Sequence, residues 1–320
     1  MSGRRALVLG GLGFIGSNLT ARLASAGAQV TAVTPSRARY AETAADLEAL
    51  RVRIVEGDLR DAAAMRAVVE GQDVVYHAAG RSGAVASMED PLADLDVNVR
   101  GTLVLLEALR AVNRDAKLVF VGSRLEYGRA GETPTAEEHD VDPLCAYAVH
   151  KLAIQQYLRL YAHLFDLRYA VARVTNPYGP GQPSSRTAYG VVNRMIHLAL
   201  ENGALTIYGD GRQRRDYIYV DDVSDALMAL GESARSDGRV YNVGTGVGTP
   251  IREMAAAITR IAGAGRIAAA DWPALAQQIE TGDFVPDISR IEREVGWRPR
   301  VALEDGLSRT VAFYRAHIAS

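Results

Sequence analysis

The sequence predicts an α/β fold in which a parallel sheet carries helices on both faces. Short apolar strands alternate with helical patterns through the first half of the chain. These strands are continuous runs of Val, Ile and Leu, as in sheets that are buried on both sides. The first strand ends in Gly10, Gly13 and Gly16, spaced three apart directly before a helical pattern. Because ligands of such sheets bind at the carboxyl ends of the strands, we expect the site there.

The expected elements follow from the apolar spacing. In the first half we expect strands at 7–9, 29–34, 52–56, 74–77 and 118–121, and helices near 17–26, 37–50, 62–70, 95–109 and 147–165. Segment 176–183 is rich in Pro and Gly, which predicts irregular structure. A helix is expected at 191–200 and a return to the sheet at 216–220 and 240–243. Thr249 and Pro250 form an expected helix start, and final helices are expected at 288–295 and 303–316.

This order predicts two lobes. We expect a nucleotide-binding domain formed by 1–172 and about 214–246. A smaller, discontinuous substrate lobe would be formed by about 173–213 and 247–320.

The composition is that of a globular protein, with 48% of the 320 residues hydrophobic and a formal net charge of only −2. We therefore expect neither nucleic acid nor a membrane as a partner. Cys145 is the only cysteine, which suits a reducing cytoplasm. The first apolar run is broken by glycines and no run is long enough to cross a bilayer, so we expect a cytoplasmic protein.

The glycine turn predicts a dinucleotide site. Glycine lets the chain turn sharply and lets a phosphate approach the backbone without an intervening Cβ. The following helix points free N–H groups and the positive end of its dipole at that phosphate. The expected contacts of this turn are Gly10, Gly13, Phe14, Ile15 and Gly16.

Three residues predict proton and hydride transfer. Tyr147 and Lys151 are four apart, so their side chains share one helix face, and Ser123 follows a strand whose carboxyl end lies at the same edge. A lysine ammonium stabilises the phenolate and lowers the tyrosine pKa. Tyr147 could then exchange a proton with an alcohol or ketone oxygen while hydride moves at the attached carbon.

Ordered motifs run along nearly the whole chain. They are the glycine turn, Gly57-Asp58-Leu59, His77-Ala78-Ala79, Asn98 with Gly101-Thr102, Ser123 with Tyr127-Gly128, Tyr147-x-x-x-Lys151, the run 173–180, Gly209-Asp210-Gly211, the run 215–222, Tyr241-Asn242-Val243-Gly244 and Gly296-Trp297. In these motifs the sequence resembles the extended short-chain dehydrogenase/reductases that act on nucleotide sugars, a group of epimerases, dehydratases, decarboxylases and reductases. The resemblance implies a Rossmann domain that carries a smaller C-terminal substrate lobe.

The resemblance also implies roles for individual residues. Asp58 would hydrogen-bond the adenine amine while Leu59 packs beside the ring. Lys151 would bind the nicotinamide ribose as well as tune the tyrosine. Further cofactor contacts are expected at Ala78, Ala79, Gly80, Asn98 and Tyr147. Expected substrate contacts are Arg81, Ser82 and Ser123 at the sugar, and Asn176 and Arg215 at the diphosphate, where an arginine fork suits phosphate geometry. No metal is expected.

Two departures from the family bear on the reaction. Thr34 stands where NAD-binding relatives have an Asp for the adenine ribose, and Ser36, Arg37 and Arg39 follow it. Hydroxyls and arginines in place of a carboxylate suit a 2′-phosphate, so NADP(H) is favoured and NAD(H) stays possible. Arg124 and Leu125 replace the Asp-Glu pair of the 4,6-dehydratases, so dehydration is disfavoured.

The leading hypothesis is therefore an NADPH-dependent reductase of a nucleotide-linked 4-keto-6-deoxy sugar, protonated by Tyr147. The alternative is a nucleotide-sugar 4-epimerase with bound NAD, and a catalytically silent nucleotide-sugar-binding protein is a third. The apolar surface of helices 95–109 and 147–165, together with the resemblance, suggests a homodimer. Glu126 has no explanation at this level. Cys145 is either a sugar contact or a small buried residue, and His150 is expected to face away from the site.

Overall fold

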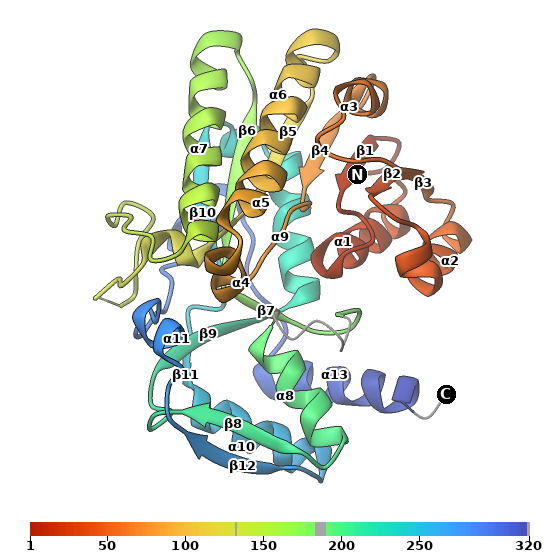
Figure 1. Ribbon diagram of the computed structural model, residues 1–320. Helices are drawn as coiled ribbons and strands as arrows, with labels where there is room; N and C mark the ends of the chain where they lie inside the picture. The colour runs from red at the N-terminus through yellow and green to blue at the C-terminus, as the bar shows by residue number, and fades with distance from the viewer. Residues whose placement is uncertain (132, 183–189, 319–320) are drawn as a thin grey trace.

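The structure, a computed structural model, describes residues 1–131, 133–182 and 190–318. Within these residues the main sheet has seven parallel strands in the order β10-β6-β5-β4-β1-β2-β3 (Figure 1). Their bounds are β1 Arg5–Leu9, β2 Gln29–Thr34, β3 Arg53–Glu56, β4 Val74–His77, β5 Lys117–Ser123, β6 Tyr169–Val174 and β10 Arg239–Val243. The expected doubly wound α/β fold is confirmed.

Helices cover both faces of this sheet. One hydrophobic cluster joins the sheet to α1 Phe14–Ser25, α2 Ala41–Ala49, α9 Val220–Glu232 and α12 Ser289–Val295. A second cluster joins the opposite face to α3 Ala62–Val69, α6 Gly101–Val112 and α7 Ala146–Phe165. Shorter helices are α4 Ala84–Glu89 and α5 Pro91–Leu95, with 3₁₀ turns at Ala38–Tyr40, Arg124–Tyr127 and Ala234–Ser236. The expected helix at 95–109 begins with a π-helical segment, Asp96–Arg100, before α6.

A third hydrophobic cluster lies below the main sheet in Figure 1, and we propose that it is the core of the smaller lobe. The helices of this lobe are α8 Val191–Leu200, α10 Ile251–Ala262, α11 Ala274–Gln278 and α13 Leu303–Ile318. Its strands form two small sheets, one of β7 Asn176–Tyr178, β9 Arg214–Tyr219 and β11 Gly248–Pro250, the other of β8 Ala204–Tyr208 and β12 Arg266–Ala270. We propose that β7 and β9 mark the junction between the two lobes.

Three expectations for this region were wrong. Residues 176–178 form strand β7, because Pro177 lies on an edge strand where its missing N–H costs no ladder bond; Pro183 lies outside the described residues. Segment 216–220 pairs through β9 with β7 and β11 instead of returning to the main sheet. Thr249 lies in β11 opposite Arg215, so α10 starts one residue later, with Pro250 as its N-cap.

Candidate active site

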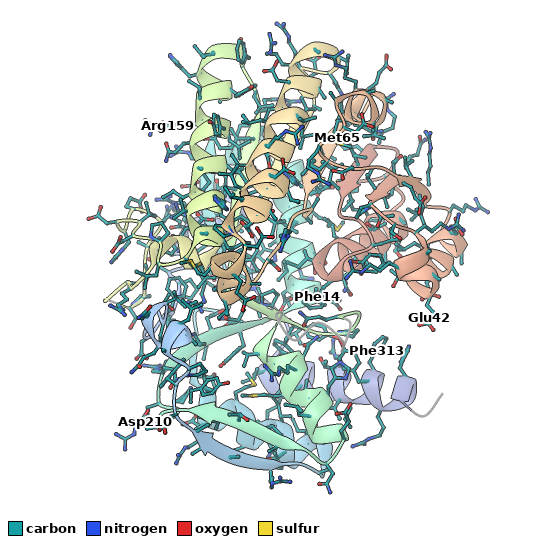
Figure 2. The ribbon with its side chains drawn as sticks, viewed as in Figure 1. Phe14, Glu42, Met65, Arg159, Asp210 and Phe313 are labelled. Carbon is teal, nitrogen blue, oxygen red and sulfur yellow. The ribbon has the colours of Figure 1, made fainter. Side chains whose placement is uncertain are left out.

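A large cavity lies at the carboxyl ends of the main-sheet strands, between these strands and α8 and β8, and has a volume of about 1200 Å³. Ligand pockets usually measure about 300–1,000 Å³, so this one has room for a dinucleotide and a second ligand. The strand ends and α1 line one side, and α8, β8 and residues 279–281 line the other. Figure 2 shows Phe14, at the start of α1, at the level where the sheet meets the lower lobe.

The glycine turn forms one wall of the cavity. Gly10, Gly13, Phe14, Ile15 and Gly16 all line it. A Cβ on Gly10 would lie 2.8 Å from the backbone of Ala79, so no larger residue fits where β1 passes β4. Helix α1 begins without a side-chain cap and without an acidic residue in its first turn. Its first N–H groups are therefore free to receive a phosphate, and the turn fits the expected dinucleotide.

Most other expected cofactor residues also line the cavity. Asp58, Leu59, Ala78, Ala79 and Gly80 do so. Arg60 donates two hydrogen bonds to the Asp58 carboxylate, at 2.6 and 2.9 Å, and these bonds lower the pKa of Asp58 to about 2. Asp58 is therefore an ionised acceptor at neutral pH.

Asn98 lies behind this wall instead of in it. Its side-chain oxygen accepts the N–H of Arg81 at 2.9 Å, and its amide donates to the Arg81 carbonyl at 3.1 Å. Asn98 therefore supports the loop at Gly80, where a Cβ would lie 2.4 Å from the asparagine oxygen.

Only some of the residues expected at the adenine ribose line the cavity. Thr34 and Arg39 line the cavity, whereas Ser36 and Arg37 do not. Arg37 forms an ion pair with Glu48 at 2.7 Å. The Ser36 hydroxyl accepts the backbone N–H of Arg39 at 3.3 Å. Of Ser36, Arg37 and Arg39, only Arg39 is therefore placed to meet a 2′-phosphate.

Ser123, Tyr147 and Lys151 share one wall of the cavity. Ser123 is the last residue of β5, and Tyr147 is held at the start of α7 by its N–H, which donates to the Ser87 hydroxyl at 3.0 Å. The Lys151 ammonium donates to the carbonyl of Val121 at 2.8 Å and lies 5.6 Å from the centre of the Tyr147 ring. The sheet edge thus brings the three expected catalytic residues together.

The pKa of Tyr147 departs from the expectation. Burial raises it, and the negative charges of Glu126 and Asp94 raise it further, while a hydrogen bond with the Ser123 side chain acts in the opposite direction. Burial also lowers the pKa of Lys151 to about 8. We expected the lysine to lower the tyrosine pKa; instead the cost of burying a phenolate is larger, and the ammonium binds a backbone carbonyl.

The expected substrate residues Arg81, Ser82, Asn176 and Arg215 line the cavity. The Asn176 amide donates to the Asp216 carbonyl at 2.6 Å. Arg215 is almost fully buried and forms an ion pair with Glu280 and a hydrogen bond with the Gly282 carbonyl. In this arrangement the guanidinium of Arg215 is anchored by the segment that follows α11.

Glu126 is a functional candidate that sequence reasoning left unexplained. It is fully buried, and its Oε1 accepts the N–H of Ser123 at 2.8 Å, while the Ser123 hydroxyl accepts the N–H of Leu125 at 3.2 Å. Oε2 accepts hydrogen bonds from Arg173, at 2.8 Å, and from Gln155. The serine-to-glutamate spacing is a capping box, a signal that was available in the sequence.

Two further features lacked a clear signal. Tyr208 and Trp272 line the cavity with ring centres 5.3 Å apart, an apolar surface suited to a nucleobase. Arg124, noticed only as a departure from the dehydratases, also lines the cavity.

Cys145 and His150, which lie near Tyr147 and Lys151 in the sequence, are both absent from the cavity lining. Cys145 is buried and does not line the cavity. Of the two interpretations, a sugar contact or a small buried residue, this position favours the second. The Nδ1 of His150 shares a hydrogen bond of 2.6 Å with Asp94, and the residue faces away from the cavity, as expected.

Fold and site together define an extended short-chain dehydrogenase/reductase. The model of the NAD dependent epimerase/dehydratase family matches residues 6–244. The chain belongs to this NAD-dependent epimerase/dehydratase family and is an NAD(P)-dependent nucleotide-sugar enzyme.

Its relatives include epimerases and dehydratases. A UDP-glucose 4-epimerase of Mycolicibacterium smegmatis is 35% identical over 97% of this chain and 98% of the relative. A dTDP-glucose 4,6-dehydratase of Streptomyces griseus is 32% identical over 97% of this chain and 94% of the relative. The UDP-glucose 4-epimerase of Thermus thermophilus, solved in complex with NAD, is 31% identical with a TM-score of 0.86, over 97% of this chain and 99% of that one. No helix among the described residues has the length and apolarity that a membrane crossing requires.

Proposed function

We propose that this enzyme is a nucleotide-sugar 4-epimerase that works with bound NAD. The observation that carries the proposal is the meeting of Ser123, Tyr147 and Lys151 on one wall of a cavity that has room for two ligands. Gly10, Gly13 and Asp58 line the part of the cavity that would hold NAD, which when bound would supply reversible hydride exchange with the two faces of C4. Tyr147 would take the proton of the C4 hydroxyl and later return it, while Ser123 orients the oxygen.

The cofactor choice rests on the adenine-ribose end. Arg37 is engaged by Glu48, and Ser36 lies outside the cavity wall, so an arginine fork for a 2′-phosphate is not assembled. The NAD of the Thermus relative and the similarity to UDP-glucose 4-epimerases support the same choice. Dehydration stays disfavoured, because Arg124 and Leu125 can supply neither the acid nor the base that water removal needs.

The second candidate is the NADPH-dependent reductase of a nucleotide-linked 4-keto-6-deoxy sugar. One observation favours it: Arg39 lines the cavity from the 3₁₀ turn that follows β2, and β2 ends at Thr34 instead of at the acidic residue that the family resemblance leads us to expect. Ser123, Tyr147 and Lys151 would then have the same roles in one direction only.

Cofactor content and product analysis separate the two. The protein is purified without added nucleotide, denatured, and its released cofactor identified. It is then incubated with UDP-glucose, without added cofactor, and followed by NMR. Released NAD and formation of the C4 epimer support the epimerase. A cofactor-free protein that consumes one NADPH for each 4-keto sugar would support the reductase and overturn the epimerase.

We further propose that the enzyme is a homodimer through α7. Val149, Leu160 and Leu164 of this helix are 47%, 45% and 55% exposed. Helices α6 and α7 run side by side at one side of the molecule in Figure 1. A second copy that covers these side chains would remove a row of leucine and valine from water.

A further inference from the structure

Buried cations in the described part of the chain usually have a carboxylate partner. Lys117 pairs with Asp237, Arg173 with Glu126 and Arg215 with Glu280. Lys151 and Arg124, which are 6% and 9% exposed, form no ion pair with a described acidic residue, and both line the cavity. The counter-charge of Lys151 belongs to the catalytic and cofactor site already described. Arg124 needs a separate explanation.

The Arg124 guanidinium has only neutral partners. It lies 5.7 Å from the centre of the Phe284 ring. Its Nη1 donates to the Thr281 hydroxyl at 2.9 Å, and its Nε donates a long bond of 3.4 Å to the Asn176 oxygen. Within the described residues its Nη2 makes no hydrogen bond. Glu280 is the nearby carboxylate. Its Oε1 is bound by Arg215 and by the Gly282 N–H, and neither of its oxygens forms an ion pair with Arg124 within the described residues.

This arrangement is costly without a ligand. A buried charge is expensive unless an opposite charge and hydrogen bonds accompany it. Burial and the neighbouring Arg215 accordingly lower the pKa of Arg124 to about 9. A guanidinium still carries its charge at neutral pH under these conditions, so an anion brought by a ligand would complete the pairing.

We propose that Arg124 binds an oxyanion of the nucleotide-sugar substrate, at a point between Ser123 and Arg215. The proposal rests on the proposed function and deepens it. Arg124 directly follows Ser123 in the chain, lines the cavity and bonds Asn176 through its Nε, so it lies between the positions expected for the reacting sugar and the diphosphate. Two groups share the required chemistry: a carboxylate on the sugar ring, or the phosphate attached to the sugar. A planar guanidinium fork suits either one.

The test measures ligand affinity by calorimetry. The ligands are UDP, UDP-glucose and UDP-glucuronate, and the variants are R124Q and R129Q. Arg129 is the matched control, because its Nε also bonds the 280–282 segment, at the Glu280 carbonyl, but Arg129 is exposed and does not line the cavity. R124Q should weaken binding roughly 10- to 100-fold, the range of one charge-assisted bond, and R129Q should change it less than about 3-fold.

Comparing the three ligands distinguishes a sugar carboxylate from the phosphate as the group that Arg124 binds. A loss confined to UDP-glucuronate supports the sugar carboxylate, and an equal loss for all three ligands supports the phosphate. Unchanged affinity of R124Q for every ligand, or an equal loss in R129Q, would overturn the proposal.

Two controls keep the result decisive. If R124Q does not fold, R124K is measured instead, because lysine keeps the positive charge but lacks the planar guanidinium. A loss of ligand affinity of about 3-fold or more in R124K supports the proposal, and wild-type affinity overturns it. A wild-type protein that binds none of the nucleotides would overturn the proposed function together with this inference. Binding that is insensitive to residue 124 would overturn this inference alone.

Discussion

Glu126 lies directly behind Ser123, and its carboxylate accepts the serine N–H at 2.8 Å while pairing with Arg173 at 2.8 Å. A charged group with no exposure to water thus supports the loop that presents the serine hydroxyl. Burial raises the pKa of Glu126, and the charge of Arg173 opposes that shift. The pair is therefore a support for the site whose loss affects both stability and geometry.

Replacing Glu126 with Gln should destabilise the protein by about 3–5 kcal/mol, because the change leaves Arg173 buried without a counter-charge. Urea unfolding of both proteins measures the difference. The matched control is Glu48→Gln, which removes the partner of Arg37 at an exposed site and should cost at most about 1 kcal/mol. Equal losses in the two variants would show that the buried pair is no more important than a surface one.

Tyr147→Phe should lower turnover roughly 100-fold or more while the fold survives, because the ring still packs and only the proton donor is lost. Tyr161→Phe is the control on the same helix. It removes a hydroxyl that donates to Glu107 at 2.5 Å, away from the cavity, and should leave turnover nearly unchanged. Steady-state rates of the wild type and both variants measure the effect, and matching circular dichroism spectra show that the fold is retained. Near-normal turnover in Tyr147→Phe would remove this residue from the mechanism.

The activity should fall as the pH rises above about 8. Burial lowers the pKa of Lys151 to about 8, so the ammonium is present below that pH and is lost above it. Burial raises the pKa of Tyr147, so the phenolate that takes the C4 hydroxyl proton depends on the nearby ammonium for stabilisation, and losing that charge should weaken the base. A plot of kcat/KM against pH should therefore show a descending alkaline limb of about tenfold per unit. A flat profile between pH 7 and 10 would mean that the charge of Lys151 is not required.

The parts of this fold that the sequence predicted are those with a local signal. Strands β2 and β4 and helix α8 occur at the expected positions, because buried strands and an amphipathic helix leave clear apolar patterns. Strand β12 was not predicted. Four of its five residues are exposed, so its pairing with β8 has no apolar signature.

The catalytic residues of the site were also predictable from local sequence signals, but their long-range partners were not. Ser123, Tyr147 and Lys151 belong to motifs with fixed spacing, and the parallel sheet gathers them at one edge. Long-range partners had no such signal: Thr281 meets Arg124 across 157 positions of the chain. The direction of the tyrosine pKa also depends on burial, which only the packed structure reveals.

Arg39→Ala should weaken NADP(H) binding about 10- to 100-fold and leave NAD(H) binding nearly unchanged, because only NADP(H) carries the 2′-phosphate that Arg39 could meet. Arg37→Ala is the control, since Arg37 is held by Glu48 outside the cavity and should affect neither cofactor. Titration of both variants with the four nucleotides measures the effect. An equal loss of NAD(H) affinity in Arg39→Ala would show that the residue does not discriminate between the cofactors.

The double variant Leu160→Glu, Leu164→Glu should be a monomer. Both side chains project from α7 and are about half exposed, and two carboxylates per copy would meet across a two-fold interface without counter-charges. Light scattering at micromolar concentration should give the mass of two chains for the wild type and of one chain for the variant. Val247→Glu is the control, because Val247 is 62% exposed but lies in the loop before β11, and this variant should stay dimeric. A wild-type protein with the mass of one chain at that concentration would refute the proposed dimer, because the apolar face of α7 would then remain in water.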